Sequence, residues 1–222
     1  MRLNPDVWII IPAYNEEKHM KDVLTKVKKI NQQIVVIDDG SSDNTKRIAE
    51  EMNVMVLHHK INLGKGAAIK TGCDFAFLND AKYVVLMDAD GQHKPEDIPT
   101  LLQALKDHDI IFGSRKLNKH MPLMMRFGNW FITTLTQFLY GIKLHDTQCG
   151  FRVLTKKAYE QVRWEAKDYS METEMIARAG KKRLRYQEVP IETIYLDKYK
   201  GTTVLDGIKI VMNMFFWKIR GA

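Results

Sequence analysis

The chain has 222 residues, of which 45% are hydrophobic and 27% are charged. Both values are typical of a globular protein with a buried core, which excludes fibrous, collagen-like and disordered classes. The length fits a single domain over residues 1–222 with an elaborated C-terminal end. Cys73 and Cys149 have no metal-ligand partner at C-x-x-C spacing, and we expect both to be reduced thiols of a cytosolic protein.

The net charge of +7 is unevenly distributed. Residues 1–112 carry 14 Lys and Arg against 17 Asp and Glu, whereas residues 113–222 carry 20 against 10. This skew indicates an anionic partner for the second half: nucleic acid, a lipid surface or a phosphate-bearing substrate. Nucleic acid is not favoured, because no known binding motif accompanies the charge. We expect neither a signal peptide nor a membrane-spanning helix, because no apolar run is long enough.

Short apolar runs alternate with helical patterns through the first half, which predicts βαβ units and a mostly parallel sheet flanked by helices. The predicted strands are 7–11, 34–37, 54–57, 83–87 and 109–112, and the predicted helices are 16–30, 43–52, 66–78 and 95–106. The second half has longer amphipathic segments at 124–140, 156–162, 171–179 and 204–219. No linker separates the halves, so the fold class is α/β with C-terminal amphipathic helices.

Polar clusters follow four consecutive strands of the predicted sheet. They are Pro12-Ala13-Tyr14-Asn15-Glu16, Asp38-Asp39-Gly40-Ser41-Ser42-Asp43, Asn62-Leu63-Gly64-Lys65-Gly66 and Asp88-Ala89-Asp90-Gly91-Gln92-His93. Ligands of open α/β sheets bind beyond the carboxyl ends of the strands, so the sequence predicts a binding site at this edge.

Asp88 and Asp90 are two residues apart at a strand end, where their carboxylates emerge on the same side. Two anions about 4 Å apart repel by roughly 4 kcal/mol at an effective dielectric near 20, so a cation is expected between them. Mg²⁺ or Mn²⁺ fits, because such ions share carboxylates with substrate phosphates, and Gln92 could add an amide oxygen. The alternative is that Asp88 caps a turn and Asp90 is solvated. We favour the metal site, because three other polar clusters are expected at the same edge of the sheet.

The remaining clusters have structural alternatives. Asp39 could accept hydrogen bonds from a nucleotide base or could form an Asx turn, and Ser42 or Asp43 could cap the next helix. The glycines around Lys65 suit a close approach of the backbone to phosphate. We expect His58, His59 and His93 to be ordinary hydrogen-bonded histidines, because their spacing does not suit a metal.

In order and spacing these motifs resemble glycosyltransferase family 2, and most closely its dolichyl-phosphate mannose synthase-like, polyprenyl-phosphate branch. The resemblance continues through Gly113-Ser114-Arg115 and Asp146-Thr147-Gln148-Cys149-Gly150-Phe151-Arg152 and covers nearly the whole chain. It implies the Rossmann-like GT-A fold of nucleotide-diphospho-sugar transferases. It also implies that residues 1–112 bind the nucleotide sugar and that residues 113–222 face the acceptor.

The resemblance assigns roles to individual residues. The implied nucleotide-sugar site consists of Pro12, Tyr14, Glu16, Ile37, Asp39, Lys65, Asp88, Ala89, Asp90 and Arg115. Asp88, Asp90 and Gln92 would hold Mg²⁺ or Mn²⁺, and Asp90, Arg115 and Asp146 would be catalytic. Arg126, Lys198 and Lys200 would bind an acceptor phosphate, although the family's R-x-x-G-x-S-K pattern here reads Lys198-Tyr199-Lys200-Gly201-Thr202-Thr203-Val204. Lysine keeps the charge but loses the bidentate fork of arginine.

The implied reaction is an inverting, metal-dependent transfer of a sugar from GDP-mannose or a UDP-hexose to a polyprenyl or dolichyl phosphate. A phosphate acceptor is already anionic and needs no strong base, whereas a saccharide hydroxyl needs a carboxylate, for which Asp146, Glu172 and Glu174 are the candidates. A saccharide-extending transferase is therefore the main alternative. A non-catalytic nucleotide-sugar binding module and a phosphate-signalling receiver domain are alternatives from other classes.

The amphipathic segments bear on the acceptor. Val204, Leu205, Ile208, Val211, Met212, Phe215 and Ile219 recur at helical spacing, with Lys209, Trp217, Lys218 and Arg220 nearby. Trp130, Phe131, Leu135, Phe138 and Leu139 form a second stripe near Arg126. Each stripe could pack on the core or lie on a lipid surface. Since the basic excess lies in the same half, we expect a peripheral protein on the cytoplasmic face of a membrane.

Overall fold

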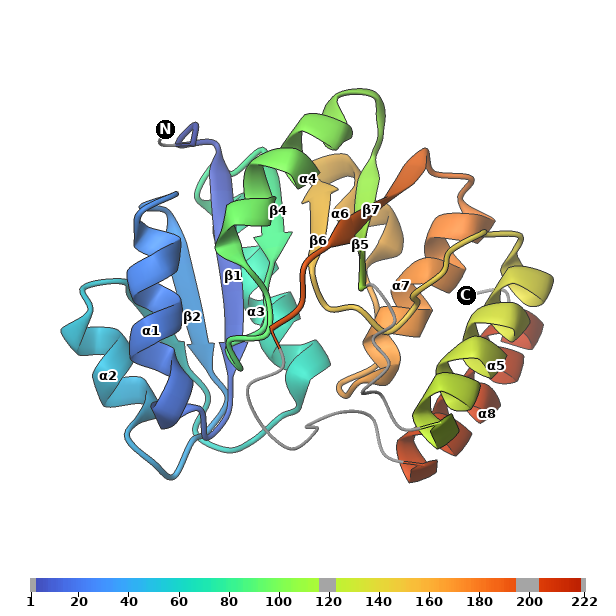
Figure 1. Cartoon of the computed structure of the whole chain (residues 1–222), viewed down its shortest axis with the longest axis horizontal. Helices are drawn as coiled ribbons and strands as arrows, with labels where there is room; N and C mark the ends of the chain where they lie inside the picture. The colour runs from blue at the N-terminus through green and yellow to red at the C-terminus, as the bar shows by residue number, and fades with distance from the viewer. Residues whose placement is uncertain (1–2, 116–122, 195–203, 221–222) are drawn as a thin grey trace.

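The computed structural model describes residues 3–115, 123–194 and 204–220 (Figure 1). In this part of the chain seven strands form one sheet. They are β1 (Val7–Ala13), β2 (Ile34–Asp38), β3 (Met55–His58), β4 (Tyr83–Leu86), β5 (Ile110–Arg115), β6 (Arg152–Thr155) and β7 (Tyr186–Ile191). The helices are α1 (Glu17–Lys28), α2 (Thr45–Glu51), α3 (Lys65–Leu78), α4 (Ile98–Ala104), α5 (Leu123–Tyr140), α6 (Lys156–Val162), α7 (Ser170–Lys181) and α8 (Val204–Arg220), with 3₁₀ turns at Pro95–Asp97 and Leu105–Asp107.

The strand order is β3-β2-β1-β4-β6-β5-β7. The ladders β1–β2, β2–β3, β1–β4 and β5–β7 are parallel, and β6 runs antiparallel to both of its neighbours. The carboxyl ends of β1, β2, β3, β4 and β5 therefore meet at one edge of the sheet. This confirms the mostly parallel sheet and the meeting of the polar strand ends.

Helices cover both faces of the sheet, which explains the nearly continuous apolar sequence of β1. Ile10 packs with residues of α3, α6 and α7 on one face, and Ile9 and Ile11 pack with residues of α1 and α4 on the other. The buried positions of α1 are Met20, Val23, Leu24 and Val27, the spacing that places side chains on one helix face.

Helices α5 and α8 form an additional layer that packs mainly on α7 (Figure 1). Ala177 of α7 is buried in a cluster with side chains from both helices, namely Ile132 of α5 and Ile210, Met214 and Trp217 of α8. Each of the two helices therefore has an inner apolar face that is buried against α7.

The sequence predicted the five strands of the first half and the C-terminal helices, but it missed β6 and β7. These two strands join the sheet beside β5, so one sheet contains strands from both halves of the sequence.

Candidate functional site

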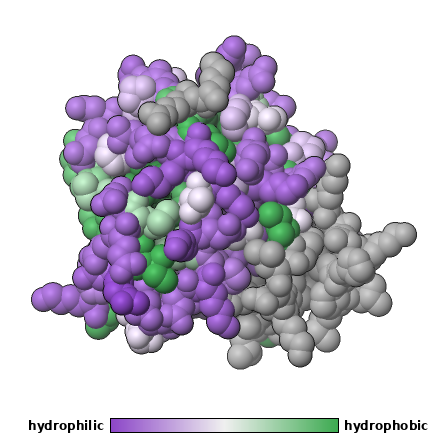
Figure 2. Space-filling model, turned by 60° about the vertical axis from the view of Figure 1, so that its left-hand side comes forward, coloured by the Kyte–Doolittle hydropathy of each residue, from purple (hydrophilic) through white to green (hydrophobic). Residues whose placement is uncertain are grey.

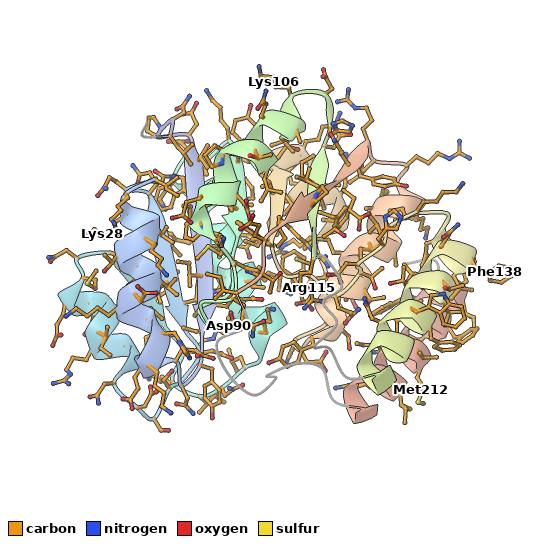
Figure 3. All side chains as sticks on the ribbon, in the orientation of Figure 1. Lys28, Asp90, Lys106, Arg115, Phe138 and Met212 are labelled. Carbon is orange, nitrogen blue, oxygen red and sulfur yellow. The ribbon has the colours of Figure 1, made fainter. Side chains whose placement is uncertain are left out.

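The carboxyl ends of β4 and β5 place Asp88, Asp90 and Arg115 at the same edge of the sheet. Figure 3 labels Asp90 and Arg115 there, between the β1 side of the sheet and the α5–α8 layer. Asp88 and Asp90 lie in the turn that follows β4, and Arg115 is the last residue of β5. The sequence predicted this edge for the cluster that contains Asp88 and Asp90, and the end of β5 adds Arg115 to it.

A buried lysine bridges two carboxylates at the centre of the site. The Nζ of Lys65, at the start of α3, lies 2.7 Å from Oδ1 of Asp88 and 2.9 Å from Oε1 of Glu172 on α7. The ring of Tyr169 also lies 5.5 Å from this Nζ. The two carboxylates raise the pKa of Lys65 against the opposing effect of burial, so its ammonium stays charged.

The glycines on either side of Lys65 approach the protein's own backbone. A Cβ added to Gly64 would lie 2.3 Å from the carbonyl oxygen of Lys167, and one added to Gly66 would lie 2.4 Å from that of Ala166. The amide N–H of Ala67 also donates to the Lys167 carbonyl. The close backbone approach that the sequence suggested for phosphate is thus made by residues 166–168.

Asp90 has a different environment from Asp88. Its Oδ1 accepts a hydrogen bond from the backbone N–H of Gln92, 3.0 Å away. Burial and the negative charge of Asp88 raise the pKa of Asp90, whereas Lys65 lowers the pKa of Asp88 despite burial. The uncompensated negative charge of the pair therefore lies mainly on Asp90.

His93 supports the acidic turn from inside the protein. Its ring stacks on Phe151 at 4.9 Å between ring centroids, and its Nδ1 accepts a hydrogen bond from the N–H of Asp88 at 3.3 Å. Burial lowers the pKa of His93, so the ring is neutral and can accept this bond. The expectation that His93 is an ordinary hydrogen-bonded histidine agrees with these contacts.

The acidic turn fits a divalent cation that is shared with a ligand. Asp88, Asp90 and Gln92 offer carboxylate and amide oxygens, the donor atoms that Mg²⁺ and Mn²⁺ prefer. Among the described residues no three His, Cys, Asp or Glu side chains are grouped as a metal cage. The remaining ligands would have to come from a bound phosphate group or from water.

Asp39 follows β2 and is almost fully buried. Its carboxylate accepts hydrogen bonds from the backbone N–H groups of Leu63 and Gly64 at 2.9 and 2.8 Å, and it lies 2.7 Å from Nδ1 of His59. The Nε2 of His59 lies 3.1 Å from Oγ1 of Thr71. Asp39 thus ties the end of β2 to the loop before α3, a role that its sequence position alone did not reveal.

The remaining residues of the implied nucleotide-sugar site are partly buried in the core and partly exposed. Pro12 and Ile37 pair in the β1–β2 ladder, and the side chain of Ile37 lies in the core. Tyr14 is half exposed, and Glu16 precedes α1 with its N–H donating to Oγ1 of Thr45 at 2.7 Å. Tyr14 therefore offers a side chain to a ligand at this edge. The buried side chains of Ile37 and of Ala89, which lies between the two acidic residues, do not.

Arg115 and Asp146 form a bidentate ion pair. The Nε of Arg115 donates to Oδ2 of Asp146 at 2.6 Å and its Nη2 donates to Oδ1 at 3.0 Å. Glu188 of β7 accepts the backbone N–H of Asp146 at 3.0 Å. The pair places a guanidinium close enough to the acidic turn to help lower the pKa of Asp88.

Arg152 is fully buried behind this site, although the sequence analysis gave it no role. Its guanidinium donates to the backbone carbonyls of Thr147, Cys149 and Glu172 at 2.8 to 3.1 Å. It therefore joins the loop before β6 to the first turn of α7. Gly150 of the same loop lies against Asp88, because a Cβ there would be 2.6 Å from Oδ2 of Asp88.

The three carboxylates that could serve as a base are all engaged. Asp146 is paired with Arg115 and Glu172 with Lys65. Glu174 accepts the N–H groups of Glu165 and Ala166 and pairs with Arg178. One oxygen of Glu172, Oε2, is buried and has no hydrogen-bond partner within residues 3–115, 123–194 and 204–220.

The structure describes no side chain of the three residues expected to bind the acceptor phosphate. Lys198 and Lys200 lie outside the described residues. Arg126 falls within the bounds of α5, but its side chain is not among those described.

The outer faces of α5 and α8 are apolar. Trp130, Phe138, Met212 and Ile219 are 60%, 84%, 68% and 86% exposed. Figure 3 shows Phe138 and Met212 pointing away from the molecule, whereas the face over α1 and α2 in Figure 2 is mainly hydrophilic. No helix among the described residues is both long and apolar enough to span a membrane. The other exposed apolar side chains on α5 and α8 are Phe131, Ile208, Phe215 and Phe216.

The sequence is similar to those of known sugar transferases. The chain is similar to the UDP-N-acetylglucosamine–dolichyl-phosphate N-acetylglucosaminyltransferase of Methanococcus voltae, at 35% identity over 96% of each chain. It is 31% identical to the polyprenol monophosphomannose synthase of Mycolicibacterium smegmatis over 96% of this chain and 87% of that one.

The fold also matches solved structures of glucosyl-3-phosphoglycerate synthase from Mycobacterium tuberculosis. In one of these, a complex with Mn²⁺, UDP-glucose and phosphoglyceric acid, the TM-score is 0.76 at 15% identity, over 96% of this chain and 79% of that one. The fold is therefore the expected GT-A fold. The profile of glycosyl transferase family 2 matches residues 8–163, and the chain is a glycosyltransferase that belongs to this family.

Proposed function

We propose that the protein transfers a sugar from a nucleotide-diphospho-sugar, such as GDP-mannose or a UDP-hexose, to a polyprenyl phosphate with inversion at the sugar carbon. Two relatives that match 96% of the chain are named for sugar transfer to dolichyl phosphate or for polyprenol monophosphomannose synthesis. The acidic turn and the Arg115–Asp146 pair supply the charges that such a transfer needs at one edge of the sheet.

On the donor side, we propose that residues 1–112 bind the nucleotide and that Tyr14 and Asp39 take part in this binding. Asp88, Asp90 and Gln92 would hold Mg²⁺ or Mn²⁺ together with the diphosphate. A divalent cation in this position neutralises charge on a leaving diphosphate. Arg115 is positioned to stabilise the same developing charge through its fixed guanidinium.

The observation that carries the choice of acceptor is the engagement of the three carboxylates. Asp146, Glu172 and Glu174 each already bind a cationic side chain. A saccharide hydroxyl would need one of them as a base, whereas a phosphate monoester is anionic near neutral pH and can attack without one. The arrangement therefore supports a phosphate acceptor over the alternative of a saccharide hydroxyl.

The apolar outer faces of α5 and α8 support a lipid as the carrier of that phosphate. Met212 and Ile219 belong to the stripe that the sequence suggested for a membrane surface, and both are exposed. Lys218 on the same helix adds a positive charge that anionic lipid attracts, whereas Lys209 is already paired with Asp168. We propose that this face rests on the cytoplasmic surface of a membrane.

The test is a transfer assay with labelled UDP- and GDP-sugars, in which each donor is paired with a polyprenyl phosphate or with a saccharide. We expect labelled lipid, dependent on Mg²⁺ or Mn²⁺, with one of the donors. The Asp90→Asn variant should lose this product while keeping its thermal unfolding transition. Labelled saccharide without labelled lipid would overturn the acceptor assignment, and donor binding without product in either arm would indicate a binding module.

A further inference from the structure

Lys65 is fixed where a metal ion would otherwise compensate Asp88. Its Nζ lies within 2.9 Å of oxygens of both Asp88 and Glu172. Glycines flank it on both sides, and the carbonyls of Ala166 and Lys167 pack against these glycines. The backbone of Lys65 therefore cannot move away from the acidic turn without breaking this contact.

The charge count of the site follows from these contacts. Among the side chains that the structure describes at this turn, Asp88, Asp90 and Glu172 contribute three negative charges, and Lys65 removes one of them. The Arg115–Asp146 pair is internally neutral. Because the attraction of a cation depends on the nearby net charge, the fixed ammonium weakens the binding of a free divalent ion at Asp88 and Asp90.

From this geometry we infer that Lys65 is a built-in counter-cation that weakens the binding of a bare divalent ion at the Asp88–Asp90 turn, so that the ion binds tightly only together with the donor diphosphate. The inference rests on the proposed function and assigns Lys65 a positioning role. The diphosphate would supply oxygen ligands to the cation, and its negative charge would replace the carboxylate charge that Lys65 compensates. By linkage, the cation and the diphosphate then strengthen each other's binding by the same factor.

The first measurement is Mn²⁺ binding by electron paramagnetic resonance, without nucleotide and then with saturating UDP or GDP. In the unmodified protein we expect weak binding of Mn²⁺ alone and much tighter binding with the nucleotide. The Lys65→Met variant should bind Mn²⁺ alone about tenfold more tightly, and the nucleotide should add less to its affinity. Lys65→Arg, which keeps the charge, should resemble the unmodified protein.

A charge-compensation cycle separates this role from a merely structural one. Glu172→Gln removes one negative charge and should weaken the binding of Mn²⁺ alone. The double variant Lys65→Met/Glu172→Gln has the original net charge, so its Mn²⁺ affinity should return to within about threefold of the unmodified value. Lys70→Met is the matched control, because Lys70 is a partly buried lysine on the same helix whose Nζ contacts the carbonyl of Trp164.

Two results would overturn the inference while leaving the proposed transfer intact. One is unchanged or weaker binding of Mn²⁺ alone by Lys65→Met, and the other is a double variant that does not return toward the original affinity. If the unmodified protein bound no Mn²⁺ with or without nucleotide, both the inference and the proposed metal site would fail. Transfer activity measured in parallel with Mg²⁺ would then show whether the transfer function also fails.

Discussion

Arg115 donates two hydrogen bonds to the carboxylate of Asp146, one to each oxygen, which fixes the plane of the guanidinium beside the acidic turn. The pair links the end of β5 to the loop before β6. Glu188 of β7 holds the backbone of Asp146 from the other side. The position of the guanidinium therefore depends on three segments that are distant in the sequence.

Replacing Arg115 with Met should lower kcat by about 10²- to 10³-fold, the effect typical of losing one donor to the developing charge. Arg115→Lys should recover only part of the loss, because an ammonium cannot form the two-pronged contact with Asp146. Steady-state kinetics with varied donor measures both effects. Arg163→Met, at an exposed arginine paired with Asp74, is the control. Equal activity of Arg115→Met and the control would remove Arg115 from the mechanism.

The buried guanidinium of Arg152 should be essential for stability. Arg152→Met leaves the carbonyls of Thr147, Cys149 and Glu172 without their donor, at a cost of about 1–3 kcal/mol for each buried group left unpaired. Urea unfolding should show a lower midpoint at an unchanged slope. A midpoint shift no larger than that of Arg183→Met, at an exposed arginine after α7, would show that water or other groups satisfy these carbonyls.

The sequence indicated most of the fold because most elements have a local signal. The strands β1, β2 and β4 are short apolar runs, and α6 was predicted with its observed bounds. The signal fails for β6, which has four residues and begins with the buried charge of Arg152. It fails for β7 because Pro190 interrupts the pattern, which is tolerated since β7 lies at the edge of the sheet.

In the site, too, residues with a local sequence signal could be predicted, and contacts between distant segments could not. Asp88 and Asp90 could be found from the sequence because both follow a single strand. The partners that set their charge could not, because Glu172 reaches Lys65 from a helix far along the chain. His59 was expected to be an ordinary hydrogen-bonded histidine, and it is. Its partner Asp39 could not be named from the sequence, because the two residues become neighbours only through the pairing of β3 with β2.

The two cysteines should be unreactive in the folded protein. Burial raises the pKa of the Cys149 thiol to about 12 and that of Cys73 well above its usual value. At pH 8 a thiol with a pKa about four units higher is a thiolate in only about one molecule in ten thousand, and the thiolate is the reacting form. A colorimetric thiol titration should detect no fast-reacting group in buffer and two in denaturant. A fast-reacting thiol in buffer would contradict the burial of both residues.

The outward apolar face should govern binding to membranes. Met212→Glu/Ile219→Glu places two negative charges on exposed positions of α8, so sedimentation with anionic liposomes should fall severalfold while the thermal unfolding midpoint changes little. The control is Leu78→Glu, because Leu78 is 83% exposed at the end of α3 and lies on a different surface. We expect Leu78→Glu to bind liposomes like the unmodified protein. If it weakened sedimentation as much as the double variant, the effect would be one of general charge, and the α5–α8 face would lose its assignment as the membrane surface.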